Sequence, residues 1–574
     1  MTTRHKVSNA PFKFSPQTTP TTFFPALSMV NTLRNRPGLI VFMACLIVAA
    51  VVAAVYAPGF NGFWLGDDLP NLHRVYAQSQ QGTLLADTLR QFSEPVPSAG
   101  AFYRPMMMLS LALNYAIAEA YYAGWYLFNF AVHVANTLLV VLIVRRFAER
   151  CQCDATVAAP LAALLFGLCP VIAEGVYWMS ARSDGWVTLL SLAGVYFWIG
   201  GATSVAARSA YLLPLLMIPA LGFKESAAVL PLQMGLLAFG WQGTLSRSQR
   251  GAVFATFVAA ALFLAWRAFL FGNAWHVYTP DAAGSIALHV KLWNSLRSIG
   301  PWWSALATAT PLLGGVYVAC CAAGIVLLVS ARPAPQWRLA LALAGASGGL
   351  ALATLLNVGA MSSLGEGGRL GYGPVAWLAL AIGVCLSQPP APVARTALAR
   401  TAATVVLALA AVVGSGMLIT NLRAAWQAQD SMRLITQSIA PWAASHPGLT
   451  MLLVPENDGA MVMARNAQGG IVLEPIQKQP YLHRILPTLL PEVQLRQEQF
   501  CRGMATRLEI IQPRLVNTET LAAISERAEA VWPKHVACWS KSQRKIVALK
   551  APPMDASCEA WLESIRTDVA ICEQ

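Results

Sequence analysis

Charged residues are scarce in this sequence. Only 12% of its 574 residues are charged, about half of what a soluble globular protein carries, so an ordinary soluble domain is excluded. Zinc-type ligand spacings are also missing, since Cys151 and Cys153 are only one residue apart. The net charge is +13. It lies mainly in every second loop between the apolar runs, which excludes a nucleic-acid-binding surface as its explanation.

The chain is instead rich in long apolar segments. It is 56% hydrophobic, with repeated apolar runs of about 20 residues, the length that spans a bilayer as a helix. We therefore predict an all-α polytopic membrane protein. The eleven predicted spans are 38–57, 123–144, 157–177, 185–201, 211–223, 227–241, 252–271, 305–329, 338–357, 371–387 and 401–420.

The distribution of charge predicts the orientation. If the basic N-terminal segment is cytoplasmic, the cytoplasmic segments hold fifteen bases and two acids, whereas the opposite loops hold nine bases and ten acids. This asymmetry is what the positive-inside rule requires. We expect residues 1–37 to be a disordered cytoplasmic tail, 38–422 to be the membrane domain with a long first external loop at 58–122, and 423–574 to lie outside the cytoplasm.

The segment 423–574 differs from the rest in composition. It alternates apolar stretches such as Leu449 to Val454 with turn signals such as Asn457-Asp458-Gly459, which predicts a small mixed α/β domain. Four cysteines in an oxidising compartment could form two disulfides with three alternative connectivities. They are Cys501, Cys538, Cys558 and Cys572.

Two adjacent carboxylates, Asp67 and Asp68, stand in the run G-F-W-L-G-D-D-L-P-N shortly after the first span. The simplest interpretation is a solvated turn, because Asp, Pro and Asn form turns. Other charged groups return to the same side of the membrane from separate loops, which favours a polar cleft. They are Arg104, Glu174, Arg182, Asp184, Lys224, Glu225 and Arg369.

A polar face lies within the second predicted span. Tyr126, Asn129, His133 and Asn136 are spaced three, four and three residues apart and share one side of a helix. Polar side chains in a span face the bundle or a cavity. Interhelical hydrogen bonding is the favoured interpretation, and a substrate role for His133 is the alternative.

These residues lie in runs that resemble a known family. The runs Y-R-P-M-M-M-L-S-L-A-L-N-Y, G-W-Y-L-F-N-F-A-V-H-V-A-N-T-L-L, P-V-I-A-E-G-V-Y-W-M-S-A-R-S-D, G-F-K-E-S-A-A-V-L-P and G-R-L-G-Y-G-P are similar to the transmembrane and tetratricopeptide-repeat O-mannosyltransferase-like family. That family belongs to the GT-C class of polyprenyl-phosphate-dependent glycosyltransferases. The chain departs from it at Tyr126 and Cys169, where the family usually has His. The repeats after the membrane part are replaced by the α/β tail, so protein mannosylation does not carry over.

The resemblance implies a GT-C fold and a hexosyltransferase that moves a sugar from a polyprenyl-phosphate donor to a hydroxyl at the extracytoplasmic face. One of Asp67 and Asp68 would be the general base of an inverting attack. The resemblance and the charges together make Arg104, Arg182, Lys224 and Arg369 the donor-phosphate candidates. Supporting roles fall to Glu174, Asp184, Glu225, His133 and Tyr372.

The expected surroundings follow from this assignment. The partners are the lipid bilayer, the donor lipid and an unidentified glycan, lipid or protein acceptor, in a bacterial-type inner membrane. A divalent metal held by Asp67 and Asp68 is compatible with the pattern but not required by it. The alternatives are a lipid-linked-glycan transporter or flippase, whose charged sites should lie near the bilayer midplane, and an inactive membrane scaffold.

Overall fold

The structure is a computed structural model. It describes residues 37–65, 68–94, 103–201, 207–241, 243–272, 289, 311–331, 336–355, 368–389, 394–445, 450–453, 535–540 and 542–549. The N-terminal tail before residue 37, Asp67, and the tail cysteines Cys501, Cys558 and Cys572 lie outside this part.

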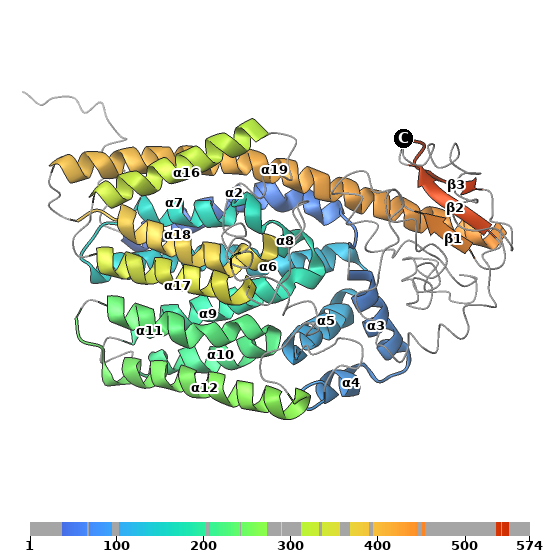
Figure 1. The fold of residues 1–574 in the computed structure, drawn as a ribbon, viewed down its shortest axis with the longest axis horizontal. Helices are drawn as coiled ribbons and strands as arrows, with labels where there is room; N and C mark the ends of the chain where they lie inside the picture. The colour runs from blue at the N-terminus through green and yellow to red at the C-terminus, as the bar shows by residue number, and fades with distance from the viewer. Residues whose placement is uncertain are drawn as a thin grey trace, which may run out of the picture.

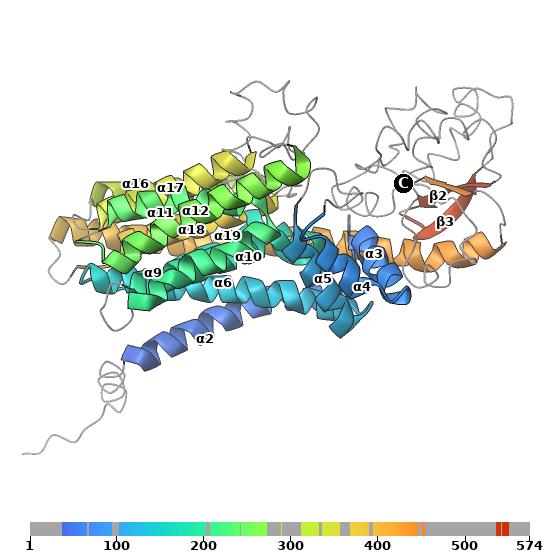
Figure 2. The ribbon, with the colours of Figure 1, turned by 90° about the horizontal axis from the view of Figure 1, so that it is seen from below.

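Long apolar helices form a bundle with their axes roughly side by side (Figures 1 and 2). The helices of the first half are α2 (Pro37–Tyr56), α6 (Tyr122–Arg150), α7 (Ala158–Gly167), α9 (Arg182–Gly200), α10 (Leu212–Phe223), α11 (Leu230–Gly240) and α12 (Arg247–Phe271). Those of the second half are α16 (Pro311–Ala331), α17 (Trp337–Leu355), α18 (Tyr372–Leu386) and α19 (Ala394–Ser445).

Short elements gather at one end of this bundle, to the right in Figure 1, which we call the α3–α5 end. Three of them are the helices α3 (Asp68–Gln80), α4 (Leu84–Arg90) and α5 (Pro105–Ala118). The connecting turns at this end are η1 (Ala57–Asn61), η2 (Pro170–Ile172), α8 (Glu174–Tyr177), η3 (Met179–Ala181), η5 (Glu225–Val229) and η6 (Gly368–Gly371). A further turn, η4 (Ala207–Tyr211), joins α9 to α10 at the opposite end.

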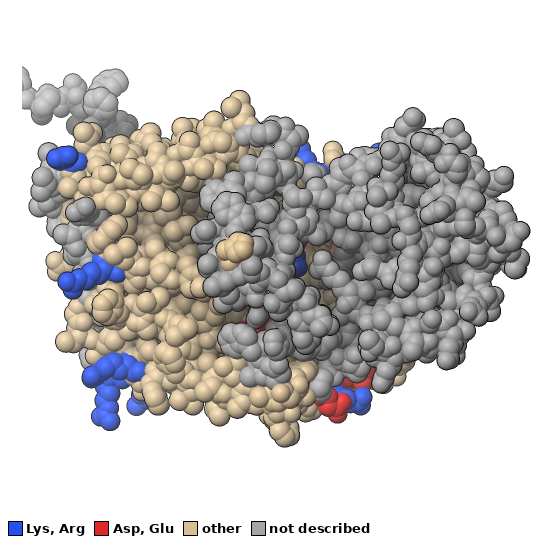
Figure 3. Space-filling model, in the orientation of Figure 1, with Lys and Arg blue, Asp and Glu red and all other residues tan. Residues whose placement is uncertain are grey.

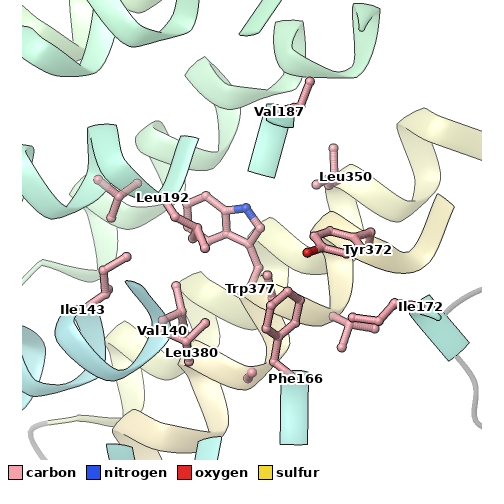
Figure 4. Packing of buried hydrophobic residues seen from close by; sticks show 14 of the residues in the cluster. Val140, Ile143, Phe166, Ile172, Val187, Leu192, Leu350, Tyr372, Trp377 and Leu380 are labelled. Atoms are coloured by element: carbon pink, nitrogen blue, oxygen red, sulfur yellow. The ribbon is translucent and has the colours of Figure 1, made fainter. Parts of the chain in front are cut away.

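The centre of the bundle is α18, where thirteen of fifteen residues are buried. Its Trp377 is enclosed by apolar side chains from α6 and α9, including Val140 and Leu192 (Figure 4). Small residues let neighbouring helices approach closely. A Cβ added to Gly383 would lie 2.6 Å from Val144 and 2.9 Å from Ala162.

The outer helices expose apolar side chains. Phe42 on α2, Phe254 on α12 and Val412 on α19 all belong to this outer surface. Lipid is the environment in which such a surface is stable, because the helices satisfy their backbone hydrogen bonds internally. Within the described residues, six helices are long and apolar enough to cross a membrane, and shorter apolar helices lie between them. The helical part of the described chain, up to Ser445, is therefore an all-α multi-pass membrane region.

Each of the eleven predicted spans coincides with one or more helices of the bundle. Several of these helices are shorter than a full crossing, so the number of crossings stays a prediction. Figure 3 shows Lys and Arg side chains projecting from the end of the bundle opposite the α3–α5 end. That distribution fits the predicted cytoplasmic side.

The described part of the tail is a three-stranded sheet beside the distal half of α19 (Figure 1). Its strands are β1 (Thr450–Leu453), β2 (His535–Ser540) and β3 (Lys545–Leu549). β1 pairs with β2 in parallel, with Thr450 opposite His535, and β2 pairs with β3 antiparallel. β1 falls on the stretch predicted as a strand. Cys538 lies in β2, and the rest of the predicted α/β domain lies outside the described residues.

The close helix contacts around α18 give a stability prediction. Gly383→Ala adds a methyl group against Val144 and Ala162, and such overpacking costs roughly 1–3 kcal/mol. The matched control is Gly235→Ala on α11, because a Cβ there meets nothing within 4 Å. It should gain about 1 kcal/mol from helix propensity. Thermal unfolding in detergent should therefore move in opposite directions for the two variants, and equal shifts would contradict this packing.

Candidate functional site

The Asp68 carboxylate is sealed inside the loop that follows the first helix. Its Oδ1 accepts hydrogen bonds from the backbone N–H and the hydroxyl of Ser180, both at 2.7 Å. Its Oδ2 accepts from the N–H groups of Leu65 at 3.1 Å and Met179 at 3.3 Å. These four bonds use all the lone-pair positions of a carboxylate. Asp68 therefore fixes the loop against η3.

Access to Asp68 is closed, since only 3% of the residue is exposed. A general base must come within hydrogen-bonding reach of the proton that it removes, and no position on Asp68 is left for an acceptor hydroxyl. From the sequence, one member of the pair is expected to be the general base, and the other to order the loop, bind an ion or lie near a cation. Asp68 has the geometry of the ordering residue, and Asp67 lies outside the described residues.

Lys224 and Asp184 form a buried ion pair between α10 and the first turn of α9. The Lys224 ammonium donates to both carboxylate oxygens of Asp184, each at 2.7 Å. Burial lowers the pKa of Lys224, while the Asp184 charge raises it. The charges of Arg104 and Arg369 also lower that pKa, which places both guanidinium groups within electrostatic reach of Lys224.

Glu225 is held between two arginines. Its Oε2 accepts from Arg104 at 3.1 Å, and its Oε1 accepts from Arg267 at 3.1 Å. Burial raises the pKa of the Glu225 carboxyl, but the charge of Arg104 and several further contributions outweigh burial, so its pKa lies below the usual value. Arg267 stands near the end of α12, and the sequence reading did not single it out. A lone arginine in an apolar run normally pairs with an acid, and that signal could have found it.

Arg369 and Glu174 make the third pairing. The Arg369 guanidinium donates to Glu174 Oε1 at 2.6 Å, and its backbone N–H donates to Oε2 at 2.9 Å. The guanidinium also lies 4.3 Å from the centre of the Trp178 ring. η6 is thereby tied to α8 by both backbone and side chain.

These three pairings define what we call the charged cluster. It consists of Arg104, Glu174, Asp184, Lys224, Glu225, Arg267 and Arg369. Four bases and three acids give a formal charge of +1. All members stand near helix ends, and each cation is paired with a carboxylate through charge-assisted bonds.

Arg182 is not part of this cluster. It is 1% exposed, and its guanidinium donates to the carbonyls of Met179 and Ser110 and to Oδ1 of Asn114. It also lies 5.3 Å from the ring of Trp125. Arg182, predicted to bind a donor phosphate, is thus enclosed and joins α5 to α9, and its phosphate-binding role stays a prediction.

His133 and Tyr372 form a hydrogen-bonded network inside the bundle. His133 Nδ1 lies 2.7 Å from the Tyr372 hydroxyl, and its Nε2 lies 3.0 Å from the carbonyl of Gly167. Asn136 donates to the same hydroxyl at 3.3 Å and to the carbonyl of Gly185 at 2.9 Å. Both ring nitrogens of His133 have protein partners. The geometry therefore fits the interhelical bonding that the sequence favoured over a substrate role.

A small pocket borders the cluster at Asp184. Its lining includes apolar side chains, such as Trp377 and Leu350, and polar side chains, such as Thr188, Ser226 and Gln233. The described residues contain no group of three His, Cys, Asp or Glu side chains that could hold a metal ion. The predicted divalent ion at the Asp67-Asp68 pair is not tested by this, because Asp67 is not among them.

Comparisons with known proteins do not assign the chain to a family. No protein-family model matches it, and no curated protein matches it. Among solved structures it is similar to the single-particle cryo-EM structure of the arabinofuranosyltransferase AftD from Mycobacteria, with 16% identity and a TM-score of 0.44. The similarity covers 87% of this chain and 35% of that chain, so the chain spans about a third of the length of AftD. A likeness at this level carries no argument about function.

The bonds of Asp68 predict a stability defect in Asp68→Asn. An amide would put an N–H group where an oxygen now accepts, leaving buried donors facing each other at about 1–3 kcal/mol. Asp87→Asn is the matched control, because Asp87 is partly exposed and its carboxylate contacts the side chains of Thr83 and Arg90. We expect a clearly lower melting temperature for Asp68→Asn alone. Equal melting temperatures for the two variants would contradict the sealed geometry.

The pKa of the same carboxyl predicts that folding stability depends on pH. Burial raises the pKa of Asp68 to about 7 from 3.8, against the hydrogen bonds that lower it. A protonated carboxyl can still donate to the Ser180 hydroxyl, so the folded chain keeps this proton between about pH 4 and 7 while the unfolded chain loses it. The contribution of Asp68 to folding stability therefore falls as pH rises through that window.

Melting temperatures measured from pH 4 to 8 should show this fall in the wild type and a flatter profile in Asp68→Asn. Parallel profiles would refute the assignment of the titration to Asp68.

Proposed function

We propose that this chain is a GT-C-type membrane glycosyltransferase. It transfers a sugar from a polyprenyl-phosphate donor to an acceptor hydroxyl at the extracytoplasmic face, with inversion at the anomeric carbon. The observation that carries the proposal is the charged cluster at the α3–α5 end, which gathers four bases beside the loop of the acidic pair in a membrane protein.

One segment brings the cluster and the loop together. Residues 174–184 pair with Arg369 through Glu174 and with Lys224 through Asp184. Between these two points, Met179 and Ser180 bind Asp68. The acidic loop and the bases are therefore fixed to the same short stretch, which is the proximity that a base and a departing phosphate require.

In the proposed reaction, the acidic pair and the cations of the cluster have different roles. The acceptor oxygen attacks the anomeric carbon, the bond from that carbon to the phosphate oxygen breaks, and the acceptor proton passes to Asp67. The polyprenyl phosphate leaves with the bonding electrons. Arg369, Arg104 and Lys224 stabilise its negative charge, as positioned cations do where charge develops. Asp68 holds the loop in place and takes no proton from the acceptor.

Lipid access supports a polyprenyl donor. Arg267 lies near the end of α12 and pairs with Glu225. Two residues further on, Phe269 is 78% exposed on the outer, lipid-facing surface of the same helix. A donor tail in the bilayer could therefore lie against α12 while its phosphate reaches the cluster.

The arrangement also bears on the transporter alternative. Transporters bind substrate near the bilayer midplane, often on broken helices. Here the charges stand near helix ends, at Arg104 before α5, Lys224 after α10 and Arg369 in η6. This position favours chemistry at one membrane face over passage through the bundle.

The direct test is an assay of donor turnover. Purified protein in nanodiscs is incubated with a panel of polyprenyl-phosphate sugars that carry different hexoses and pentoses, and release of carrier phosphate is followed. At least one donor should release its carrier faster than the protein-free control, and transfer to a hydroxyl acceptor should give a single inverted anomer. Transport without release of carrier phosphate would instead establish the transporter.

The roles of Asp67 and Arg369 predict different kinetic losses. Asp67→Asn removes the proposed base and should lower turnover by roughly a hundredfold or more, while donor binding is kept. Arg369→Ala should weaken donor binding as well as turnover, because the phosphate loses a charge-assisted contact. The matched control is Arg145→Ala, whose arginine pairs with the exposed Glu149 on α6. Wild-type turnover in Asp67→Asn would remove the proposed reaction centre.

A further inference from the structure

A second pocket lies between the end of η1 and the helix α19, away from the residues that form the charged cluster. Its volume is about 210 Å³. Gly62 lines one side, and Trp426, Gln429, Asp430 and Arg433 line the other. None of these residues has a role in the chemistry proposed above.

Gln429 presents an unsatisfied acceptor at this pocket. It is 1% exposed, and its Nε2 donates to the Tyr122 hydroxyl at 2.9 Å and to the carbonyl of Tyr177 at 3.5 Å. A carbonyl can only accept, so the nitrogen must face Tyr177 and the oxygen must face the other way. Gln429 Oε1 is buried and has no hydrogen-bond partner among the described residues. Such groups are rare in folded proteins and call for an explanation.

Trp426 presents the complementary group one helical turn away. Its indole Nε1 is also buried and has no hydrogen-bond partner within the described part of the chain. Trp426 and Gln429 thus both line the pocket, and each contains one buried polar atom, a donor and an acceptor, without a partner among the described residues. A ligand with hydroxyl groups could satisfy both atoms, because a hydroxyl both donates and accepts.

The charges of the pocket favour a neutral ligand over a phosphate. Asp430 pairs with Arg433 on the same helix and with Arg544 in the turn between β2 and β3. The lining itself carries one acid and one base, and both nearby arginines are already paired with Asp430. A neutral ligand with many hydroxyls fits this chemistry, and a saccharide is the class that combines them with an apolar face for Trp426.

The pocket lies beside the acidic loop. Gly62 stands six residues before Asp68, and a Cβ on Gly62 would lie 2.2 Å from Gln429 Oε1. Tyr177, which accepts from Gln429, lies two residues before Met179, which binds Asp68 together with Ser180. The pocket and the charged cluster thus approach the same loop through different residues.

We infer that this pocket binds a neutral saccharide unit of the acceptor, an inference that rests on the proposed glycosyltransferase. The donor phosphate belongs to the charged cluster, and the sugar that receives the transferred group is held by Trp426 and Gln429. Arg544 in the β2–β3 turn pairs with Asp430 at the pocket. The tail would therefore contribute to acceptor recognition.

Saccharide binding can be measured without any catalysis. Saturation-transfer NMR with a panel of neutral methyl glycosides and disaccharides, on the full chain in nanodiscs, should detect binding. Trp426→Phe keeps an aromatic ring but removes the N–H group, and Gly62→Ala puts a methyl group against Gln429 Oε1. Each should weaken the affinity about three- to tenfold, the scale of one lost hydrogen bond.

The matched control is Gln427→Leu, an exposed position on the same helix, which should bind as the wild type does. Melting temperatures check that the variants fold. Equal affinity in the wild type, Trp426→Phe and Gly62→Ala, or no saccharide binding by the wild type, would overturn the inference. Carrier-phosphate release is scored separately: binding without release would refute the transferase alone, whereas release with unaltered binding in both variants would refute the pocket alone.

Discussion

The pairing of buried charges along residues 174–184 is the interaction on which the α3–α5 end depends. Glu174 holds η6 through Arg369, Asp184 holds the end of α10 through Lys224, and the intervening N–H groups hold Asp68. A buried charge without a partner is costly, and breaking one side of such a pair commonly costs 3–5 kcal/mol. The pairing therefore fixes loops from four parts of the chain in one arrangement. In the proposed function, the same pairing also holds the cations in position to bind the donor phosphate.

Much of the fold could be predicted from the sequence, because lipid leaves few choices to an apolar chain. Runs near 20 residues must form helices, and the described part of each of the eleven predicted spans contains helix. The three-and-four spacing of Asn129, His133 and Asn136 correctly predicted one buried face. The boundaries of the short spans were less certain, since α7 ends at Gly167 and the chain continues through η2 and α8.

The partners of the charged residues could not be predicted, because pairing depends on how distant loops meet. Arg182 and Arg369 look alike in sequence, yet Arg182 is enclosed by α5 and α9 while Arg369 lies in the cluster. Asp68 is sealed by Ser180, a contact across 112 residues. Arg267 was hidden inside an apolar run. The inference at Trp426 and Gln429 depends on two atoms that lack partners among the described residues, and no sequence pattern reports a missing partner.

The most direct measurement of the central claim is a cryo-EM structure of the protein with a non-hydrolysable polyprenyl-phosphonate sugar. The account predicts phosphonate density within hydrogen-bonding distance of Arg369 and of Arg104 or Lys224. The prenyl tail should lie against α12, and the anomeric carbon should face the Asp67 loop. Phosphonate density near the middle of the bundle, or at the end opposite α3–α5, would contradict the account.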